Sequence, residues 1–172
     1  DNEVLILVDE AYHPFCEITA LSWINRFPNL VIARTFAKAW GLAGLRIGFA
    51  VGNNEVISFL HKVKPMYEIN SVAVAVVTKM LEKHNEVISS VHRLKAGMSL
   101  FLDNMKEFEY DVIEGAGNFS HVCFGERLEE IKKKLKNNVL FKPNFEHPSL
   151  EGFSRFSSAP KEQMQSLIEF IK

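Results

Sequence analysis

The chain has 172 residues and a net charge of −1, with 20 lysines and arginines against 21 acidic residues. This balance provides no electrostatic footprint for nucleic acid or an anionic membrane surface. No apolar run approaches the ~20 residues of a membrane span, and the two cysteines and six histidines show no metal-ligand spacing. We expect a cytoplasmic protein without a metal site, long enough for one domain or a large domain with an appendage.

The first predicted element is a strand over residues 4–8, whose continuous apolar run is typical of a parallel strand buried on both faces. Asp9 follows at its carboxyl end, where open α/β sheets bind ligands, although a turn or helix-capping aspartate is the alternative. An amphipathic helix is predicted over 18–27 and a second strand over 30–33. In such a β-α-β unit, Asp9 and the loop after the second strand leave the sheet at the same edge.

The loop TFAKAWGLAGLR, residues 35–46, carries one lysine, Lys38, between apolar and glycine residues. A lysine there either extends its ammonium to water or lies in a dry pocket, where a lowered pKa makes the amine a nucleophile. We expect the second arrangement, with burial supplied by the loop's large apolar side chains: Phe36, Trp40, Leu42 and Leu45. Arg46 is placed to bind an anion, so the pair suggests an aldehyde cofactor that carries a phosphate.

Beyond the lysine loop, the pattern predicts a strand over 46–51 that runs antiparallel, because the loop is too short for a crossover helix. Helices are predicted over 54–63 and 71–83, the second largely buried, and over 84–108, with one apolar stripe along about six turns. The remaining segments are short: strands at 110–113, 119–124, 139–141 and 153–156, and helices at 126–136 and 160–171.

These patterns predict an α/β fold in three parts. Residues 1–83 form part of a mostly parallel sheet with flanking helices. A long helix over 84–108 bridges to a smaller α+β domain over 109–172. The chain opens almost directly on a strand and has no initiating methionine, so we expect it to be a segment of a longer protein.

Two motifs make the chain recognisable. The run Val8-Asp9-Glu10-Ala11-Tyr12 resembles the Asp-x-x-Tyr element of the pyridoxal-phosphate-dependent aminotransferases of fold type I, classes I and II. The 35–46 loop resembles the Schiff-base lysine signature of the same family, and the order Asp, Tyr, Lys, Arg and a distal Arg is the family's order. The runs LAGLR and KPMYEIN are most similar to the histidinol-phosphate aminotransferase branch. The resemblance covers nearly the whole chain and maps it onto the C-terminal half of a family member.

The resemblance implies pyridoxal 5'-phosphate as cofactor and Lys38 as the catalytic residue that forms the Schiff base. It implies that Asp9 pairs with the pyridine nitrogen and Tyr12 with the ring hydroxyl. Thr35 is expected to contact the cofactor phosphate, and Arg46 is the cofactor-binding arginine. The implied reaction is a ping-pong amino transfer between an amino acid, or an amino-phosphate compound, and a 2-oxo acid.

Arg155 lies in the predicted strand over 153–156, where the family holds the substrate's α-carboxylate with an arginine. Its aromatic neighbours, Phe153 and Phe156, are expected to shield it from water. The alternative for Arg155 is an exposed arginine on an edge strand.

Two further functional readings remain open. One is a lyase or decarboxylase of the same fold, and the other is a non-catalytic interaction module. The presence of Asp9, Tyr12, Lys38 and Arg46 together favours an enzyme, although Ala37 stands where many members have a second serine.

The family's glycine-rich phosphate turn, its ring-stacking aromatic residue, its asparagine beside the ring hydroxyl and its N-terminal arm have no counterpart in the chain. The family resemblance also implies that the complete protein is a homodimer. Residues 1–172 alone are expected to leave apolar faces and a strand edge uncovered, to associate or aggregate, and to bind the cofactor weakly.

Overall fold

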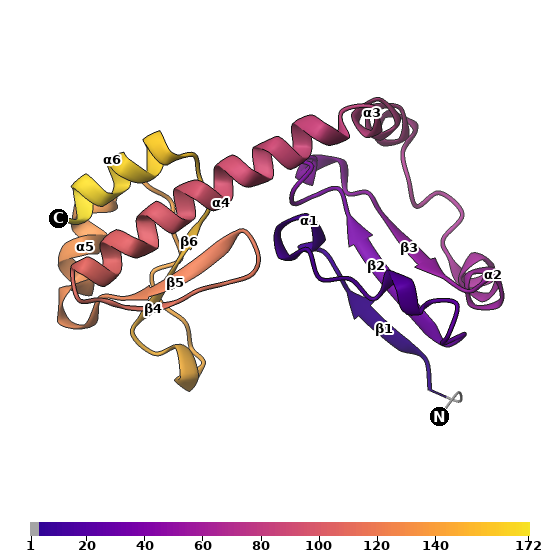
Figure 1. The fold of residues 1–172 in the computed structure, drawn as a ribbon, viewed down its shortest axis with the longest axis horizontal. Coiled ribbons are helices and arrows are strands. Elements are labelled where there is room, and N and C mark those ends of the chain that lie inside the picture. The colour runs from indigo at the N-terminus through magenta and orange to yellow at the C-terminus, as the bar shows by residue number, and fades with distance from the viewer. Residues whose placement is uncertain (1–3) are drawn as a thin grey trace. The chain divides into compact units, whose positions relative to one another are not determined.

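The computed structural model describes residues 4–172, whose contacts divide the chain into two compact units, Asp1–Ile88 and Ser89–Lys172. The first contains three strands in the order β1-β2-β3: β1 (Ile6–Asp9), β2 (Leu30–Thr35) and β3 (Gly48–Gly52) (Figure 1). β1 and β2 are parallel, and β3 returns antiparallel to β2. Both predicted directions are therefore confirmed, and the chain leaves β1 and β2 at the same edge of the sheet.

β1 is apolar but not buried. Ile6 and Leu7, which alternate between the two faces of β1, are 46% and 64% exposed, so neither face of the strand is fully covered by the described residues. The prediction of burial on both faces is therefore wrong for this chain. The expectation that apolar residues and a strand edge would be uncovered is confirmed.

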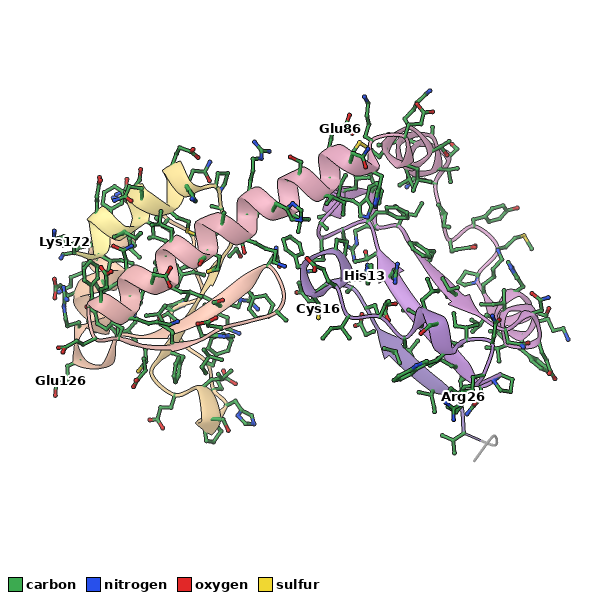
Figure 2. All side chains as sticks on the ribbon, viewed as in Figure 1. His13, Cys16, Arg26, Glu86, Glu126 and Lys172 are labelled. Carbon is green, nitrogen blue, oxygen red and sulfur yellow. The ribbon has the colours of Figure 1, made fainter. Side chains whose placement is uncertain are left out.

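The connection from β1 to β2 contains a four-residue helix, α1 (His13–Cys16), and one 3-10 turn, Leu21–Trp23. Figure 2 marks the ends of α1. The predicted helix over 18–27 is wrong, because this segment forms only the 3-10 turn. The Glu10 carboxylate accepts the backbone N–H of Ala20 at 2.7 Å, which fixes the chain in a turn at this point.

Two capped helices follow β3. The Asn53 side chain accepts the Glu55 N–H at 2.9 Å and caps α2 (Asn54–Val63), as predicted. Asn70 caps α3 (Ser71–Leu81) in the same way. α3 buries only Ala73 and Val77, whereas Val72 and Val74 are exposed. The prediction that α3 is largely buried is therefore wrong.

α4 (His84–Glu107) begins in the first unit and continues into the second, and its bounds confirm the predicted long helix. The second unit adds an antiparallel sheet and two helices (Figure 1): β4 (Asp111–Ile113), β5 (Phe119–Cys123), β6 (Phe153–Ser157), α5 (Leu128–Leu135) and α6 (Lys161–Ile171). The strand predicted over 139–141 is wrong, because only Lys142 forms a bridge, to Arg155.

The second unit has a continuous core between α4, α5, α6 and one face of the sheet. Its fully buried side chains include Phe101, Met105, Ile131, Phe156 and Ile171. α4 packs tightly at Gly97, where an added Cβ would lie 1.9 Å from the carbonyl oxygen of Ala159. Glycine is therefore required at this position for the close approach of the backbones.

We predict that Gly97→Ala lowers the free energy of unfolding of the protein by about 1–3 kcal/mol, the usual cost of overpacking. Helix propensity alone predicts a gain of about 0.5–1 kcal/mol, so the sign separates the two effects. Urea unfolding measures the change. Gly44→Ala is the control, because a Cβ there meets nothing within 4 Å. Equal effects of the two substitutions would contradict the prediction.

Candidate active site

The carboxyl edge of the first sheet brings together the two motifs found in the sequence. Asp9 ends β1, and its Oδ1 accepts the Ala11 N–H at 2.9 Å. Tyr12 follows at the start of α1, and the Lys38 Nζ lies 5.2 Å from the centroid of its ring. This distance is within the range of a cation–π contact. Asp9, Tyr12 and Lys38 thus share one edge of the sheet.

The loop that carries Lys38 is closed by its own hydrogen bonds. The Thr35 hydroxyl accepts the Ala37 N–H at 3.0 Å and donates to the Ile47 carbonyl at 3.4 Å. The Lys38 carbonyl accepts the Gly41 N–H at 3.0 Å. Gly41 has a φ of +71°, a value that favours glycine and turns the chain back. The loop therefore presents Lys38 from a fixed turn.

The structure corrects the expected burial of Lys38, which is exposed. The apolar side chains of its loop pack instead against Ile47 and α3, in a cluster formed by Phe36, Trp40, Leu42, Leu45, Ile47, Ala73 and Val77. They are therefore not free to enclose the ammonium. Within residues 4–172, Lys38 forms no ion pair.

Arg46 ends the same loop in the left-handed region, with a φ of 52°. Its side chain is exposed, and its Nη1 donates a hydrogen bond to the Ala43 carbonyl oxygen at 3.1 Å. In the described part of the chain, no carboxylate pairs with its guanidinium. Since a guanidinium has five N–H donors, most of those of Arg46 remain available to an anion.

Arg155 lies in the second unit, on β6, and its side chain is exposed. Phe156, 1% exposed, points into the core on the opposite face of the sheet, so the predicted shielding by both flanking aromatic residues is wrong. The aromatic ring that the Arg155 guanidinium contacts comes from the neighbouring strand β5. The guanidinium carbon is 5.2 Å from the centroid of the Phe119 ring.

Lys142 is a candidate that the sequence analysis missed. Its N–H donates to the Arg155 carbonyl at 3.2 Å, and the Arg155 N–H donates to its carbonyl at 2.8 Å. The two cations are thus cross-strand partners, and both line a hollow of about 300 Å³. Like charges directly opposite each other are unfavourable, so an anion bound in this hollow would relieve the repulsion, although Lys142 Nζ also lies 4.3 Å from the centroid of the Phe145 ring. The sequence feature that could have identified Lys142 as a site residue is its position immediately after the apolar run 139–141.

His121 is buried beside these cations, opposite Arg155 in the register of β5 and β6. Its ring contacts Phe119 and Phe145 edge to face, at centroid distances of 5.6 and 5.3 Å. Burial lowers the pKa of His121, and the nearby charge of Arg155 lowers it further. The imidazole is therefore neutral at physiological pH.

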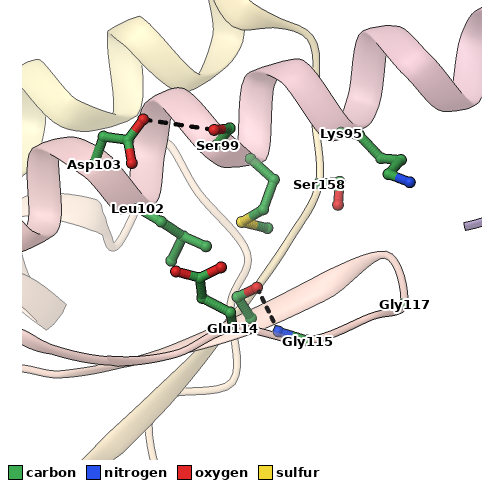
Figure 3. A pocket seen from close by; sticks show the side chains of 10 residues that line it. Lys95, Ser99, Leu102, Asp103, Glu114, Gly115, Gly117 and Ser158 are labelled. Carbon is green, nitrogen blue, oxygen red and sulfur yellow. Dashed lines mark hydrogen bonds between the residues drawn. The ribbon is translucent and has the colours of Figure 1, made fainter. Parts of the chain in front are cut away.

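A smaller hollow of about 190 Å³ lies on the α4 side of the second sheet (Figure 3). The Gly115 N–H donates to the Ser120 hydroxyl at 3.2 Å, and the Ser99 hydroxyl lies 3.5 Å from an Asp103 oxygen. Ser120 alternates with His121 along β5, so this hollow is on the face opposite to Arg155.

No group of three or more histidine, cysteine, aspartate or glutamate side chains in residues 4–172 has the arrangement of a metal site. Among the helices of this part of the chain, none has both the length and the apolar composition to cross a membrane.

Residues 1–171 match the family model described as aminotransferase class I and II. The chain belongs to this aminotransferase family. It is 32% identical over 146 residues to histidinol-phosphate aminotransferase 1 of Dechloromonas aromatica (strain RCB), covering 83% of this chain and 40% of the relative. It is 30% identical over 169 residues to histidinol-phosphate aminotransferase of Geobacter sp. (strain M21), covering 98% and 48%. The chain thus spans about half the length of these aminotransferases or less.

The fold agrees with this aminotransferase family. The structure of histidinol-phosphate aminotransferase from Sinorhizobium meliloti in complex with pyridoxal-5'-phosphate superimposes with a TM-score of 0.83 at 21% identity, covering 98% of this chain and 48% of that one. L-threonine-O-3-phosphate decarboxylase from Porphyromonas gingivalis gives 0.83 at 20% identity, covering 99% and 55%. The predicted α/β fold class and family are confirmed.

We predict that Arg155→Met raises the pKa of His121 toward, but not fully to, the ordinary value of about 6.5, because burial of the imidazole remains. NMR titration of the full-length protein measures this pKa, with the signal assigned by its loss in His121→Gln. Lys136→Met, which removes an exposed cation elsewhere in the second unit, is the control and should leave the His121 titration unchanged.

The sign of the linked stability effect follows from the same shift. Because folding lowers the pKa of His121, its contribution to stability is present above about pH 6.5 and is lost as the pH falls through the lowered value. An unchanged His121 titration in Arg155→Met would show that the guanidinium does not act on this ring.

Proposed function

We propose that the complete protein is a pyridoxal-phosphate-dependent aminotransferase and that Lys38 is its catalytic amine. The observation that carries the proposal is the Lys38 ammonium 5.2 Å from the Tyr12 ring, at the sheet edge where Asp9 ends β1. Family membership supports the reaction type. The substrates we propose are an amino acid, or an amino-phosphate compound, and a 2-oxo acid.

The side chains at this edge fit pyridoxal phosphate in their chemistry. The cofactor has an aldehyde for the Lys38 amine, a ring nitrogen for the Asp9 carboxylate and a ring hydroxyl for Tyr12. Its phosphate suits the Thr35 hydroxyl and the Arg46 guanidinium, which forms no ion pair with the carboxylates of residues 4–172.

When bound, the cofactor supplies an electron sink for the charge that develops at the substrate's α-carbon. Asp9 holds a proton on the ring nitrogen through a charge-assisted hydrogen bond. The Lys38 amine would accept the proton that leaves the substrate's α-carbon. Arg155 and Lys142 bind the anionic group of the substrate.

We further propose a domain organisation and an assembly for the complete protein. Residues 1–83 belong to the large cofactor domain, 84–108 form the bridging helix, and 109–172 form the small domain. The protein is a cytoplasmic homodimer. Exposed apolar side chains around the α2–α3 connection support an interface there, among them Met66 and Tyr67 at 80% and 89%.

We predict that borohydride reduction of the full-length protein with pyridoxal phosphate attaches the cofactor to Lys38, as peptide mapping would show. Lys38→Arg should lose the label. Lys62→Arg is the matched control, because Lys62 also lies over an aromatic ring, 4.9 Å from the centroid of Phe59, but outside the sheet edge. Label on another lysine with Lys38 unmodified would contradict the proposal.

A second prediction concerns Arg155, whose replacement by Met should raise KM for the amino acid about 10- to 100-fold. This range corresponds to the loss of a charge-assisted hydrogen bond worth about 1.5–3 kcal/mol. Cofactor binding should be unchanged. Lys136→Met, which removes an exposed cation elsewhere in the second unit, is the control. An unchanged KM would exclude Arg155 from substrate binding, and release of carbon dioxide from the amino acid would favour a decarboxylase.

A further inference from the structure

Glu10 and Arg34 form an ion pair directly beside the residues of the candidate site. Glu10 follows Asp9, and Arg34 precedes Thr35. The guanidinium donates to Glu10 Oε2 from Nε at 3.0 Å and from Nη2 at 2.8 Å. Glu10 is only 7% exposed. The pair therefore joins the ends of β1 and β2, with the carboxylate buried and the guanidinium partly exposed.

The crossover between the two strands supplies the remaining partners. The Thr19 hydroxyl donates to Glu10 Oε2 at 2.9 Å and accepts from Arg34 Nη2 at 2.8 Å. The Ala20 N–H donates to Glu10 Oε1 at 2.7 Å. Both carboxylate oxygens thus have protein donors, which argues against a role for Glu10 as a catalytic acid or base.

The hydrogen bonds to Glu10 favour the ionised form of its carboxyl group. Burial alone would raise the pKa of Glu10, but the Ala20 N–H and the Arg34 guanidinium together outweigh it and hold the pKa below its ordinary value. Glu10 is therefore an ionised, fully bonded carboxylate at neutral pH.

The pair lies on the face of the sheet opposite to the candidate site. Side chains alternate along a strand, so Glu10 shares a face with Val8, and Arg34 with Ile32. Val8 and Ile32 pack together beneath the crossover. Asp9 and Thr35 occupy the other face by the same alternation. The pair can therefore fix both strand ends without occupying space needed by a cofactor.

We infer that Glu10 and Arg34 are positioning residues that hold Asp9 and Tyr12 in place relative to Thr35 and Lys38. This inference rests on the proposed function. A small displacement of supporting groups is costly at such sites, where a misplacement of about 1 Å can cost about 100-fold in rate. The alternative is an ion pair that stabilises the fold without affecting the site.

The experiment compares Glu10→Gln, Arg34→Gln and the double variant in the full-length protein. Pyridoxal phosphate affinity is measured from its visible absorbance, and the absorbance of the bound cofactor is titrated with pH. Each single variant should bind the cofactor about tenfold more weakly and shift the titration. The double variant should be no worse than either single variant, because the two residues act as one unit.

A matched control separates positioning from general stability. Arg127→Gln removes another forked arginine, one that donates to Glu130 at 3.2 and 3.3 Å in the second unit. It should lower Tm without changing cofactor affinity or the titration. Arg34→Lys, which keeps the charge but not the fork, should restore part of the affinity lost in Arg34→Gln, and it also carries the test if Glu10→Gln does not fold.

Each outcome decides between the proposals. If the wild-type protein binds no pyridoxal phosphate, the proposed function fails and this inference fails with it. If the wild type binds and the Glu10 and Arg34 variants lose only Tm, as Arg127→Gln does, the proposed function stands and the positioning role is overturned. Additive losses in the double variant would likewise show that the pair does not act as a unit.

Discussion

The parallel pairing of β1 with β2 is the constraint on which the candidate site depends. Asp9 ends one strand and Thr35 ends the other, and only parallel strands place both ends at one edge. If β2 ran the other way, its lysine loop would emerge at the far end of β1, which has four residues, about 13 Å away. The contact between Lys38 and the Tyr12 ring therefore follows from strand direction before any side-chain contact is considered.

The antiparallel return of β3 determines how Lys38 is presented. Thr35 pairs with Gly48, so the loop between them begins and ends at the same place. Its large apolar side chains pack to one side, against Ile47 and α3, and they leave the lysine on the other. The apolar composition that suggested a buried lysine thus has the opposite result here, because the apolar side chains bury one another.

Local patterns predicted the parts of the fold that local interactions determine. Asn53 caps α2 through a bond to a residue two positions away, and the apolar stripe of α4 has a period that only a helix satisfies. The failures depend on distant partners. The Glu10 carboxylate binds the Ala20 N–H in the turn of the crossover, ten residues away, and Lys142 faces Arg155, thirteen residues away in the sequence. No pattern within a single window of the sequence contains such pairings.

The same distinction applies to the site. The residue types at Asp9, Tyr12, Lys38 and Arg46 were found from motifs, and strand order accounts for the shared edge of the motif segments. The motifs did not give a role to Glu10 or Arg34, because a buried ion pair between two strands is recognisable only when the register is known.

The two units differ in the interactions that stabilise each of them internally, and this difference affects the candidate site. The second unit encloses a continuous apolar core, whereas the first has small separate clusters and many exposed apolar side chains. Apolar burial is not directional, so small clusters constrain the relative position of two strand ends only weakly. Charge-assisted hydrogen bonds are directional, and the bonds of Glu10 and Arg34 act at those strand ends. Where the apolar core is small, the geometry of the sheet edge therefore depends on a few polar contacts behind it.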